Sequence, residues 1–231
     1  MKTVGLIGGI APESTIAYYR GIIAAYRAQQ PDGNYPSILL NSINLKKVLA
    51  LAAADARDQM VEYMVEELDK LARAGADFAA LTSNTPHLVF DALQQRSPLP
   101  LISIVEAACA AAQRLGLQKL GLFGTRFTMQ GGFYQAVFGR AGITVVLPEA
   151  HEQDYVHEKY MNELVYAKFL PETRAELLAI VERMHARQSI EGLILGGTEL
   201  PLTLTEATHQ GLPFLDTTSI HVERIVAEML S

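Results

Sequence analysis

The sequence of 231 residues has a single cysteine and no tryptophan. Because one thiol can form neither a disulfide nor a thiolate metal cage within the chain, disulfide scaffolds and zinc ribbons are excluded. We therefore expect a reducing, cytoplasmic location. No apolar run approaches the roughly 20 residues that a membrane helix needs, so we expect no membrane partner.

Blocks of one charge sign are also missing. The 19 Lys and Arg and the 25 Asp and Glu give a net charge of −6 and are scattered along the chain. Since nucleic-acid binding needs a clustered basic surface, we expect no nucleic-acid partner. The glycines have the wrong spacing for a phosphate-binding or dinucleotide-binding loop, and His87, His151 and His157 lack metal-ligand spacing. No cofactor and no metal are expected.

Short apolar runs alternate with segments of helical periodicity. The runs, which predict strands, cover residues 3–7, 37–42, 78–81, 101–104, 119–123, 144–147, 192–195 and 214–215. In residues 62–74 and 174–187, apolar side chains recur every three or four positions and predict helices. This alternation is typical of an α/β fold with a doubly wound parallel sheet and right-handed crossovers. Residues 1–9 are interpreted as the first strand and not as a signal peptide.

An internal repeat with a period of about 115 residues divides the chain. Three segments recur in the same order: residues 5–9 resemble 121–125, residues 81–86 resemble 196–201, and residues 99–103 resemble 212–216. The repeat predicts two pseudo-symmetric, doubly wound halves with a cleft between them. The N-terminal α/β half covers residues 1–116, the C-terminal half covers residues 117–231, and the C-terminal helix is a candidate to cross back and pack on the first half.

Four turns follow predicted strands and precede predicted helices, at residues 8–14, 82–86, 124–128 and 196–199. In open α/β sheets, ligands bind outside the carboxyl ends of the strands, where helix N-termini attract a carboxylate or phosphate. Helix capping offers a second explanation, because Asn84, Thr85, Thr128 and Thr198 are good N-cap residues. Glu199 suits the positive end of its own helix in the same way. Both readings stay open on these residues alone.

These turns resemble those of the aspartate/glutamate racemase family, and the similarity extends over nearly the whole chain. The matching segments are residues 8–15 with Tyr18 and Tyr19, residues 84–87, Gly124 and Thr125 with Thr128 and Met129, residues 163–165 with Lys168, and residues 196–201. The resemblance implies cofactor-independent racemisation of a small amino acid without pyridoxal phosphate or metal. It also implies a carboxylate-bearing substrate and a homodimer.

In that family, a cysteine from each half exchanges a proton with the substrate α-carbon. The resemblance places these two catalytic positions at Thr82 and Gly197. It assigns substrate binding to Gly9, Asn84, Thr85, Thr128, Lys168, Thr198 and Glu199, with Asn84, Thr85 and Thr198 on the α-carboxylate and Lys168 near a side-chain carboxylate. The pocket shape that selects the side chain is expected from loops at residues 44–48 and 151–157.

Both cysteine positions are substituted, so proton transfer between two thiols is not possible. A threonine hydroxyl needs a base to activate it, and glycine has no side chain. The one thiol, Cys109, lies in an alanine-rich helical pattern and is expected to be a core residue. Two functions stay open: an amino-acid racemase or isomerase that uses Thr82, water or Glu199, and a catalytically impaired binding or regulatory homologue. A different one-sided reaction on a diacid ranks last.

Overall fold

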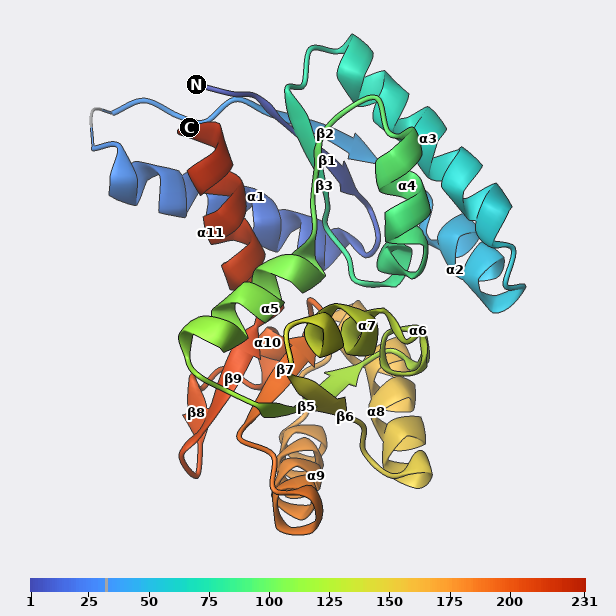
Figure 1. Cartoon of the computed structure of the whole chain (residues 1–231), viewed down its shortest axis with the longest axis vertical. Helices are drawn as coiled ribbons and strands as arrows, with labels where there is room; N and C mark the ends of the chain where they lie inside the picture. Colours follow the sequence, from blue (N-terminus) through green and yellow to red (C-terminus); the bar gives the residue numbers. More distant parts are fainter. Residues whose placement is uncertain (32) are drawn as a thin grey trace. The chain divides into compact units, whose positions relative to one another are not determined.

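Two compact units make up the chain, of which this computed structural model describes residues 1–31 and 33–231. The first unit contains Met1–Ile104 and Thr218–Ser231, and the second contains Val105–Thr217. Each unit has its own sheet of mainly parallel strands flanked by helices, as Figure 1 shows. The predicted α/β class is confirmed.

The first unit has four parallel strands in the order β2-β1-β3-β4. The strands are β1 (Val4–Gly8), β2 (Ile38–Ser42), β3 (Phe78–Leu81) and β4 (Leu101–Ile102). Its helices are α1 (Pro12–Gln29), α2 (Leu45–Ala53), α3 (Arg57–Arg73), the 3₁₀ helix η1 (Thr85–Val89) and α4 (Phe90–Arg96), together with α11 (Thr217–Met229) from the end of the chain.

Alternate residues of the central strands enter two separate hydrophobic cores of the first unit. Val4, Leu6, Phe78 and Ala80 pack with apolar residues of α1 and α11. Ile7, Ala79 and Leu81 pack on the other face with residues of α2, α3 and α4. Because both faces are covered, β1 and β3 are apolar at every position, as is typical of buried parallel strands.

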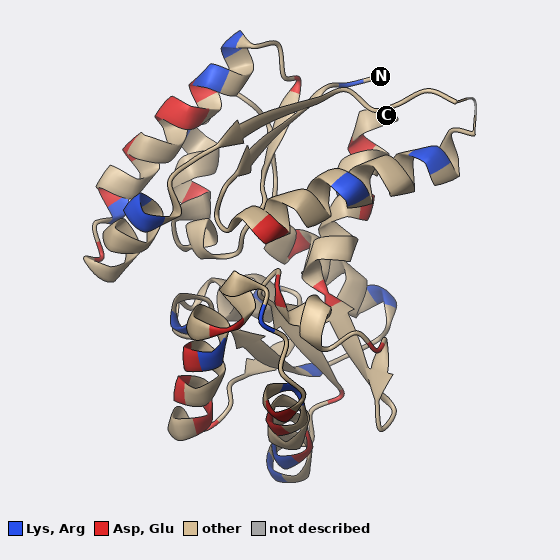
Figure 2. Ribbon diagram, turned by 180° about the vertical axis from the view of Figure 1, so that it is seen from behind, with Lys and Arg blue, Asp and Glu red and all other residues tan. Residues whose placement is uncertain are grey.

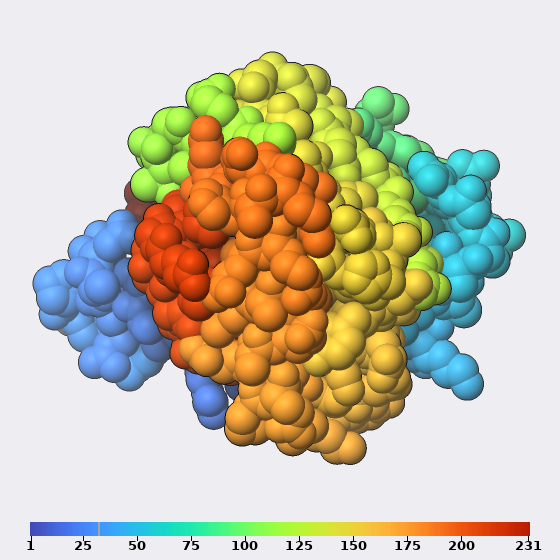
Figure 3. Space-filling model, turned by 90° about the horizontal axis from the view of Figure 1, so that it is seen from below, coloured from blue at the N-terminus to red at the C-terminus, as the bar shows by residue number. Residues whose placement is uncertain are grey.

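The second unit has five strands in the order β6-β5-β7-β9-β8, and only the β8–β9 pair is antiparallel. They are β5 (Lys119–Gly124), β6 (Thr144–Val146), β7 (Gly192–Gly196), β8 (Thr208–His209) and β9 (Leu212–Asp216). The helices are α5 (Ile104–Arg114), α6 (Arg126–Gln130), α7 (Phe133–Arg140), α8 (Ala150–Asn162), η2 (Leu164–Tyr166), α9 (Pro171–Gln188) and α10 (Leu200–Thr203). Helices α8 and α9 lie side by side at the surface of this unit (Figure 3).

All eight predicted strands exist, and so do the predicted helices at residues 62–74 and 174–187. The run at 101–104 gives a shorter strand than predicted because Ile104 already begins α5. Strand β8 was not predicted, because a strand of only two residues is too short to show an alternation of apolar and polar side chains. The order β2-β1-β3-β4 recurs as β6-β5-β7-β9, which is the arrangement that a duplicated segment requires. A boundary of that duplication at residue 116 stays a prediction, because a compact unit need not coincide with a duplicated segment.

Charged residues lie mainly on the helices, most visibly on α3, α8 and α9 (Figure 2). Across residues 1–31 and 33–231, no helix combines the length and the apolar character required to cross a membrane.

Candidate functional site

The carboxyl ends of neighbouring parallel strands lie at one edge within each sheet. In the first unit this edge carries residues 8–15 after β1 and residues 82–87 after β3, which we call the first strand-end site. In the second unit it carries residues 124–128 after β5 and residues 196–199 after β7, which we call the second strand-end site. The predicted site residues fall on these four turns, except Lys168.

Gly9 turns the chain from β1 towards α1. Its φ is +82°, and a Cβ there would lie 2.7 Å from Oγ of Ser42 and 2.8 Å from the backbone nitrogen of Ile43. Only glycine fits this conformation and this space. The Gly9 N–H donates to Oγ1 of Thr15 at 2.8 Å, so this amide serves the turn itself. The N-cap residue of α1, Ala11, provides no side-chain cap to the free N–H groups of that helix.

Thr82 follows β3 directly and is completely buried. Its hydroxyl donates to the carbonyl oxygen of Ile7 on β1 at 3.1 Å, and its Oγ1 lies 3.4 Å from Oγ1 of Thr15. The Ser14 hydroxyl donates to the Thr82 carbonyl at 3.1 Å. Among the described residues, no acidic or basic side chain hydrogen-bonds to the Thr82 hydroxyl. Its proton is therefore given to a backbone carbonyl, and the geometry provides no base to activate it.

The capping explanation fails for Asn84 and Thr85. Asn84 occupies the N-cap position of η1, but its side chain makes no cap hydrogen bond, and Thr85 is already the first residue of the helix. Both residues are buried. Buried polar side chains that do not cap a helix are compatible with ligand binding, which stays a prediction for these two residues.

His87 fixes the same turn as a neutral ring. Its Nδ1–H donates to the carbonyl of Ser83 at 3.2 Å, and its Nε2 accepts from the backbone N–H of Ile104 at 3.4 Å. Burial, followed by the proximity of His221, lowers the pKa of His87 to about 3. The ring also stacks on Phe90 with a centroid distance of 4.8 Å. The first strand-end site is therefore built around an uncharged histidine.

In the second strand-end site, Thr125 is the cap and Thr128 is not. The Thr125 side chain accepts from the backbone N–H of Thr128 at 3.3 Å, so the expected capping role of Thr128 belongs to its neighbour. Thr128 is buried against the backbone of two glycines. A Cβ at Gly124 would lie 2.8 Å from Cβ of Thr128, and one at Gly196 would lie 3.1 Å from its Cγ2. The two glycines thus leave room for Thr128.

Gly197 is adjacent to the ring of Tyr160, which comes from the last turn of α8. A Cβ at Gly197 would lie 2.9 Å from both Cζ and the phenol oxygen of Tyr160, and nearer still to Cε2. Carbon atoms in contact prefer about 3.5 to 4.0 Å. The space that a side chain at position 197 would need is therefore occupied by this ring.

Glu199 holds Tyr160 in place. The Tyr160 hydroxyl donates to Oε2 of Glu199, and the Thr198 hydroxyl donates to the same oxygen at 2.9 Å. Burial, and then the negative charge of Glu199, raises the pKa of Tyr160 well above its ordinary value. Glu199 stands at the N-cap position of α10, but its side chain makes no cap hydrogen bond. Thr198 does not occupy that N-cap position, so the capping explanation is wrong for it too.

Lys168 lies outside both strand-end sites, on an exposed stretch after η2. Its backbone N–H donates to the carbonyl of Glu163 at 3.0 Å, and its charge helps to lower the pKa of the Glu163 carboxyl. Its contact with a ligand stays a prediction. Residues 151–157, expected to form a loop, belong instead to α8, and residues 45–48 begin α2.

Cys109 is buried in α5, as expected of a core residue, and burial raises the pKa of its thiol. A raised pKa leaves the thiol protonated and unreactive near neutral pH. Within the described part of the chain, no group of three or more His, Cys, Asp or Glu side chains could hold a metal ion.

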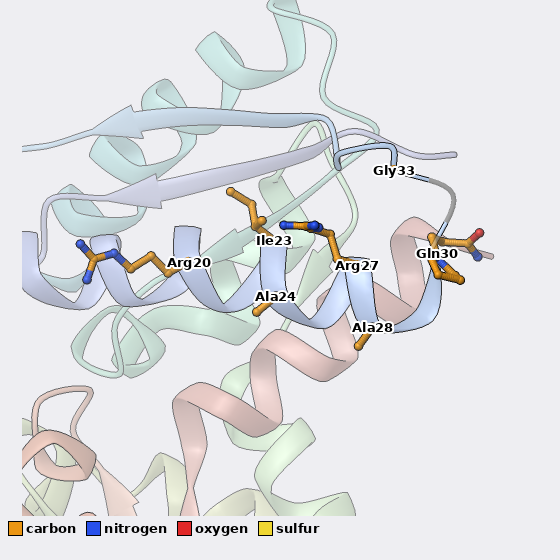
Figure 4. A pocket seen from close by; sticks show the side chains of 8 residues that line it. Arg20, Ile23, Ala24, Arg27, Ala28, Gln30 and Gly33 are labelled. Atoms are coloured by element: carbon orange, nitrogen blue, oxygen red, sulfur yellow. The ribbon is translucent and has the colours of Figure 1, made fainter.

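The first unit also has an open hollow of about 650 Å³ along the C-terminal half of α1. Arg20, Ile23 and Arg27 line it together with Gln30, Pro31 and Gly33 (Figure 4). The first strand-end site lies at the opposite, N-terminal end of the same helix. This hollow is therefore separate from the candidate site.

The sequence model of the Asp/Glu/Hydantoin racemase family matches residues 7–225, and the chain belongs to that family. It is similar to the broad specificity amino-acid racemase RacX of Bacillus subtilis, with 24% identity over 99% of this chain and 98% of RacX. A candidate Asp/Glu racemase from Yersinia pestis is 31% identical, with a TM-score of 0.89 and full coverage of both chains. An aspartate racemase homologue from Pyrococcus horikoshii OT3 is also 31% identical over both full chains, with a TM-score of 0.85.

Tyr160 is the residue of the candidate site that sequence reasoning missed. It lies 37 positions before Gly197 in an ordinary amphipathic helix, so neither motif nor spacing marks it. The one available signal was the glycine itself, because a glycine in place of a larger side chain leaves a volume that some other group must fill.

Proposed function

We propose that this protein binds a small amino acid or dicarboxylate and, unlike a two-thiol racemase, racemises it weakly or not at all. The proposal rests on the absence of a proton-transferring group at positions 82 and 197. The Thr82 hydroxyl donates to the Ile7 carbonyl, and position 197 has no side chain and faces the Tyr160 ring. Racemisation needs a proton acceptor on one face of the α-carbon and a donor on the other, and neither position supplies one.

Binding of a carboxylate is supported by the polar residues that remain. Asn84, Thr85 and Thr198 are buried at strand ends, and none of them caps a helix. The first turn of the 18-residue helix α1 has no side-chain cap either, and such a helix end attracts anions. The absence of a cofactor and a homodimeric state belong to the same proposal.

A thermal-shift panel tests the binding. The probes are the L and D forms of aspartate and glutamate, with succinate and malate as dicarboxylates. A ligand at 100 times its dissociation constant stabilises the folded state by about 2.7 kcal/mol, so at least one probe should raise the melting temperature clearly. Thr198→Val should remove the shift, whereas Thr144→Val, at an exposed position of β6, should keep it. If no probe shifts the wild type, the proposal is wrong.

A second candidate function is a thiol-independent isomerase, which the buried carboxylate of Glu199 favours. This carboxylate is 1% exposed and lies two residues from position 197, the turn position that the family fills with cysteine. The pKa of Tyr160 is raised well above its ordinary value, so its phenol stays protonated near neutral pH and cannot act as a base. Glu199 would therefore have to take the α-proton. In that case the wild type exchanges the substrate α-hydrogen in deuterated water, and Glu199→Gln loses the exchange.

A further inference from the structure

The backbone of position 197 does not itself require glycine. Gly9, Gly33, Gly75, Gly116, Gly132, Gly142 and Gly211 have positive φ angles, and Gly197 does not belong to this group. Any L-residue can therefore adopt the backbone conformation found there. The reason for a glycine at position 197 has to be spatial.

The nearest contacts that a side chain at this position would make all come from one residue. The three atoms nearest to a Cβ at position 197 all belong to Tyr160, and they are Cε2, Cζ and the phenol oxygen. They form the outer end of the side chain, beyond the branch that a leucine shares with a tyrosine. A residue that ends at its δ carbons would leave this volume empty.

The ring is fixed and cannot easily give way. Tyr160 is 6% exposed, and its hydroxyl is bound to Glu199, which also accepts from Thr198. Its helix α8 is tied to α9 through Glu152, which accepts from Arg183 at 2.7 Å and from Arg187 at 2.6 Å. Rotation of the ring would break the bond to a buried carboxylate, which costs more than an ordinary hydrogen bond.

We infer that Tyr160 is a specificity-determining residue of the second strand-end site. Its ring takes the volume of a side chain at position 197, excludes a thiol from that position, and forms the wall that a ligand meets there. The part of this inference that concerns a ligand rests on the proposed function. The part that concerns the volume at position 197 does not, so the two can fail separately.

A double-mutant cycle in urea unfolding tests the inference without any ligand. Gly197→Ala adds only the Cβ, and overpacking of this kind should raise the unfolding equilibrium constant roughly 10- to 100-fold. In the Tyr160→Leu background the same substitution should change the constant by less than about 3-fold, because the colliding atoms are gone. If Gly197→Ala prevents folding, recovery of a folded protein by Tyr160→Leu is the equivalent result.

Two controls separate sterics from other causes. Tyr160→Phe keeps the ring carbons nearest to position 197 but removes the phenol oxygen and the bond to Glu199, so Gly197→Ala should still be harmful there, although less than in the wild type. Gly139→Ala, on an exposed face of α7 where a Cβ meets nothing, should leave the protein as stable as before or more stable. Equal effects of Gly197→Ala in the wild-type and Tyr160→Leu backgrounds, or failure to fold in both, would overturn the inference.

The thermal-shift panel, extended to 2-aminoadipate, then measures which ligand each variant prefers. With Tyr160→Leu, the preference should move about 5- to 10-fold from aspartate towards the longer glutamate or 2-aminoadipate, as expected for one or two added methylenes. An unchanged preference contradicts the role in specificity. If neither the wild type nor any variant binds a probe, but Tyr160→Leu relieves the destabilisation by Gly197→Ala, the proposed function is wrong. Tyr160 is then still the group that excludes a side chain at position 197.

Discussion

The turn after β3 and the turn after β7 occupy equivalent places in the two sheets, yet they lack the family thiol in different ways. Position 82 keeps a side chain, and its hydroxyl is satisfied by the neighbouring strand. Position 197 has no side chain, and a residue from another helix has filled the space. A single substitution can therefore return a thiol to the first turn, whereas the second turn requires two coordinated changes.

The largest expected effect comes from restoring both thiols. Thr82→Cys with Gly197→Cys should stay inactive, because the Tyr160 ring occupies the space of the second cysteine. Adding Tyr160→Leu should raise α-hydrogen exchange of aspartate or glutamate at least about 100-fold, the lower end of the usual contribution of acid–base groups. The readout is the loss of the Cα–H proton NMR signal in deuterated water.

If the double cysteine variant is as active as the triple variant, Tyr160 is no obstacle and the contrast between the two turns disappears. A triple variant that folds and binds its ligand but exchanges no hydrogen would show that the pocket has diverged in other places as well.

Acid should affect the first unit more strongly than the second, where burial lowers the pKa of the half-buried His157 as well. In the first unit, His87 and His221 are buried and neutral, with pKa values lowered by burial to about 3 and about 4 from an ordinary 6.5. His221 accepts from the Tyr18 hydroxyl at 2.7 Å and donates to the Ile102 carbonyl at 3.0 Å, so both ring nitrogens are engaged. Between pH 6.5 and 4 the unfolded state therefore binds more protons than the folded state.

The free energy of unfolding should consequently fall by about 2 to 3 kcal/mol between pH 7.5 and 5.5. Urea unfolding at the two pH values measures the loss, and hydrogen exchange should show residues 83–87 losing protection before residues 196–199. The paired carboxylates Glu152 and Glu163 have lowered pKa values, so their contribution is lost only below about pH 4.5. A double variant with glutamine in place of both histidines should flatten the pH dependence, and an equally steep loss in that variant would contradict this explanation.

The smallest effects come from removing single hydroxyls. Tyr160→Phe leaves the buried Glu199 carboxylate with one donor fewer and should cost about 1 to 3 kcal/mol of unfolding free energy. Thr82→Val should cost only about 1 kcal/mol, because the Ile7 carbonyl still accepts from the Thr82 backbone N–H at 3.0 Å. Urea midpoints of the two variants give the comparison directly. A larger loss for Thr82→Val would mean that the first turn, and not the second, depends on its hydroxyl.

Apolar runs such as residues 78–81 and 192–195 predicted the sheets because both faces of a parallel strand must be buried. The repeated glycine turns predicted the strand ends, since Gly9 and Gly124 are needed for close approach. Capping and ligand binding stayed open as alternatives in the sequence because Thr125 and Thr128 are equally good caps by type, and only the helix boundary decides between them. Tyr160 lay beyond prediction, because its contact with Gly197 depends on how α8 packs, and no local pattern encodes that.

We propose that this member of the racemase family has kept its acid-binding turns and lost proton transfer at both cysteine positions. Proton NMR of aspartate and glutamate in deuterated water with the wild-type protein tests it most directly. We predict a Cα–H signal that decays at most slightly faster than in a protein-free sample, under conditions where the same amino acid raises the melting temperature. Rapid loss of that signal, abolished by Glu199→Gln, would contradict it and establish a thiol-independent isomerase.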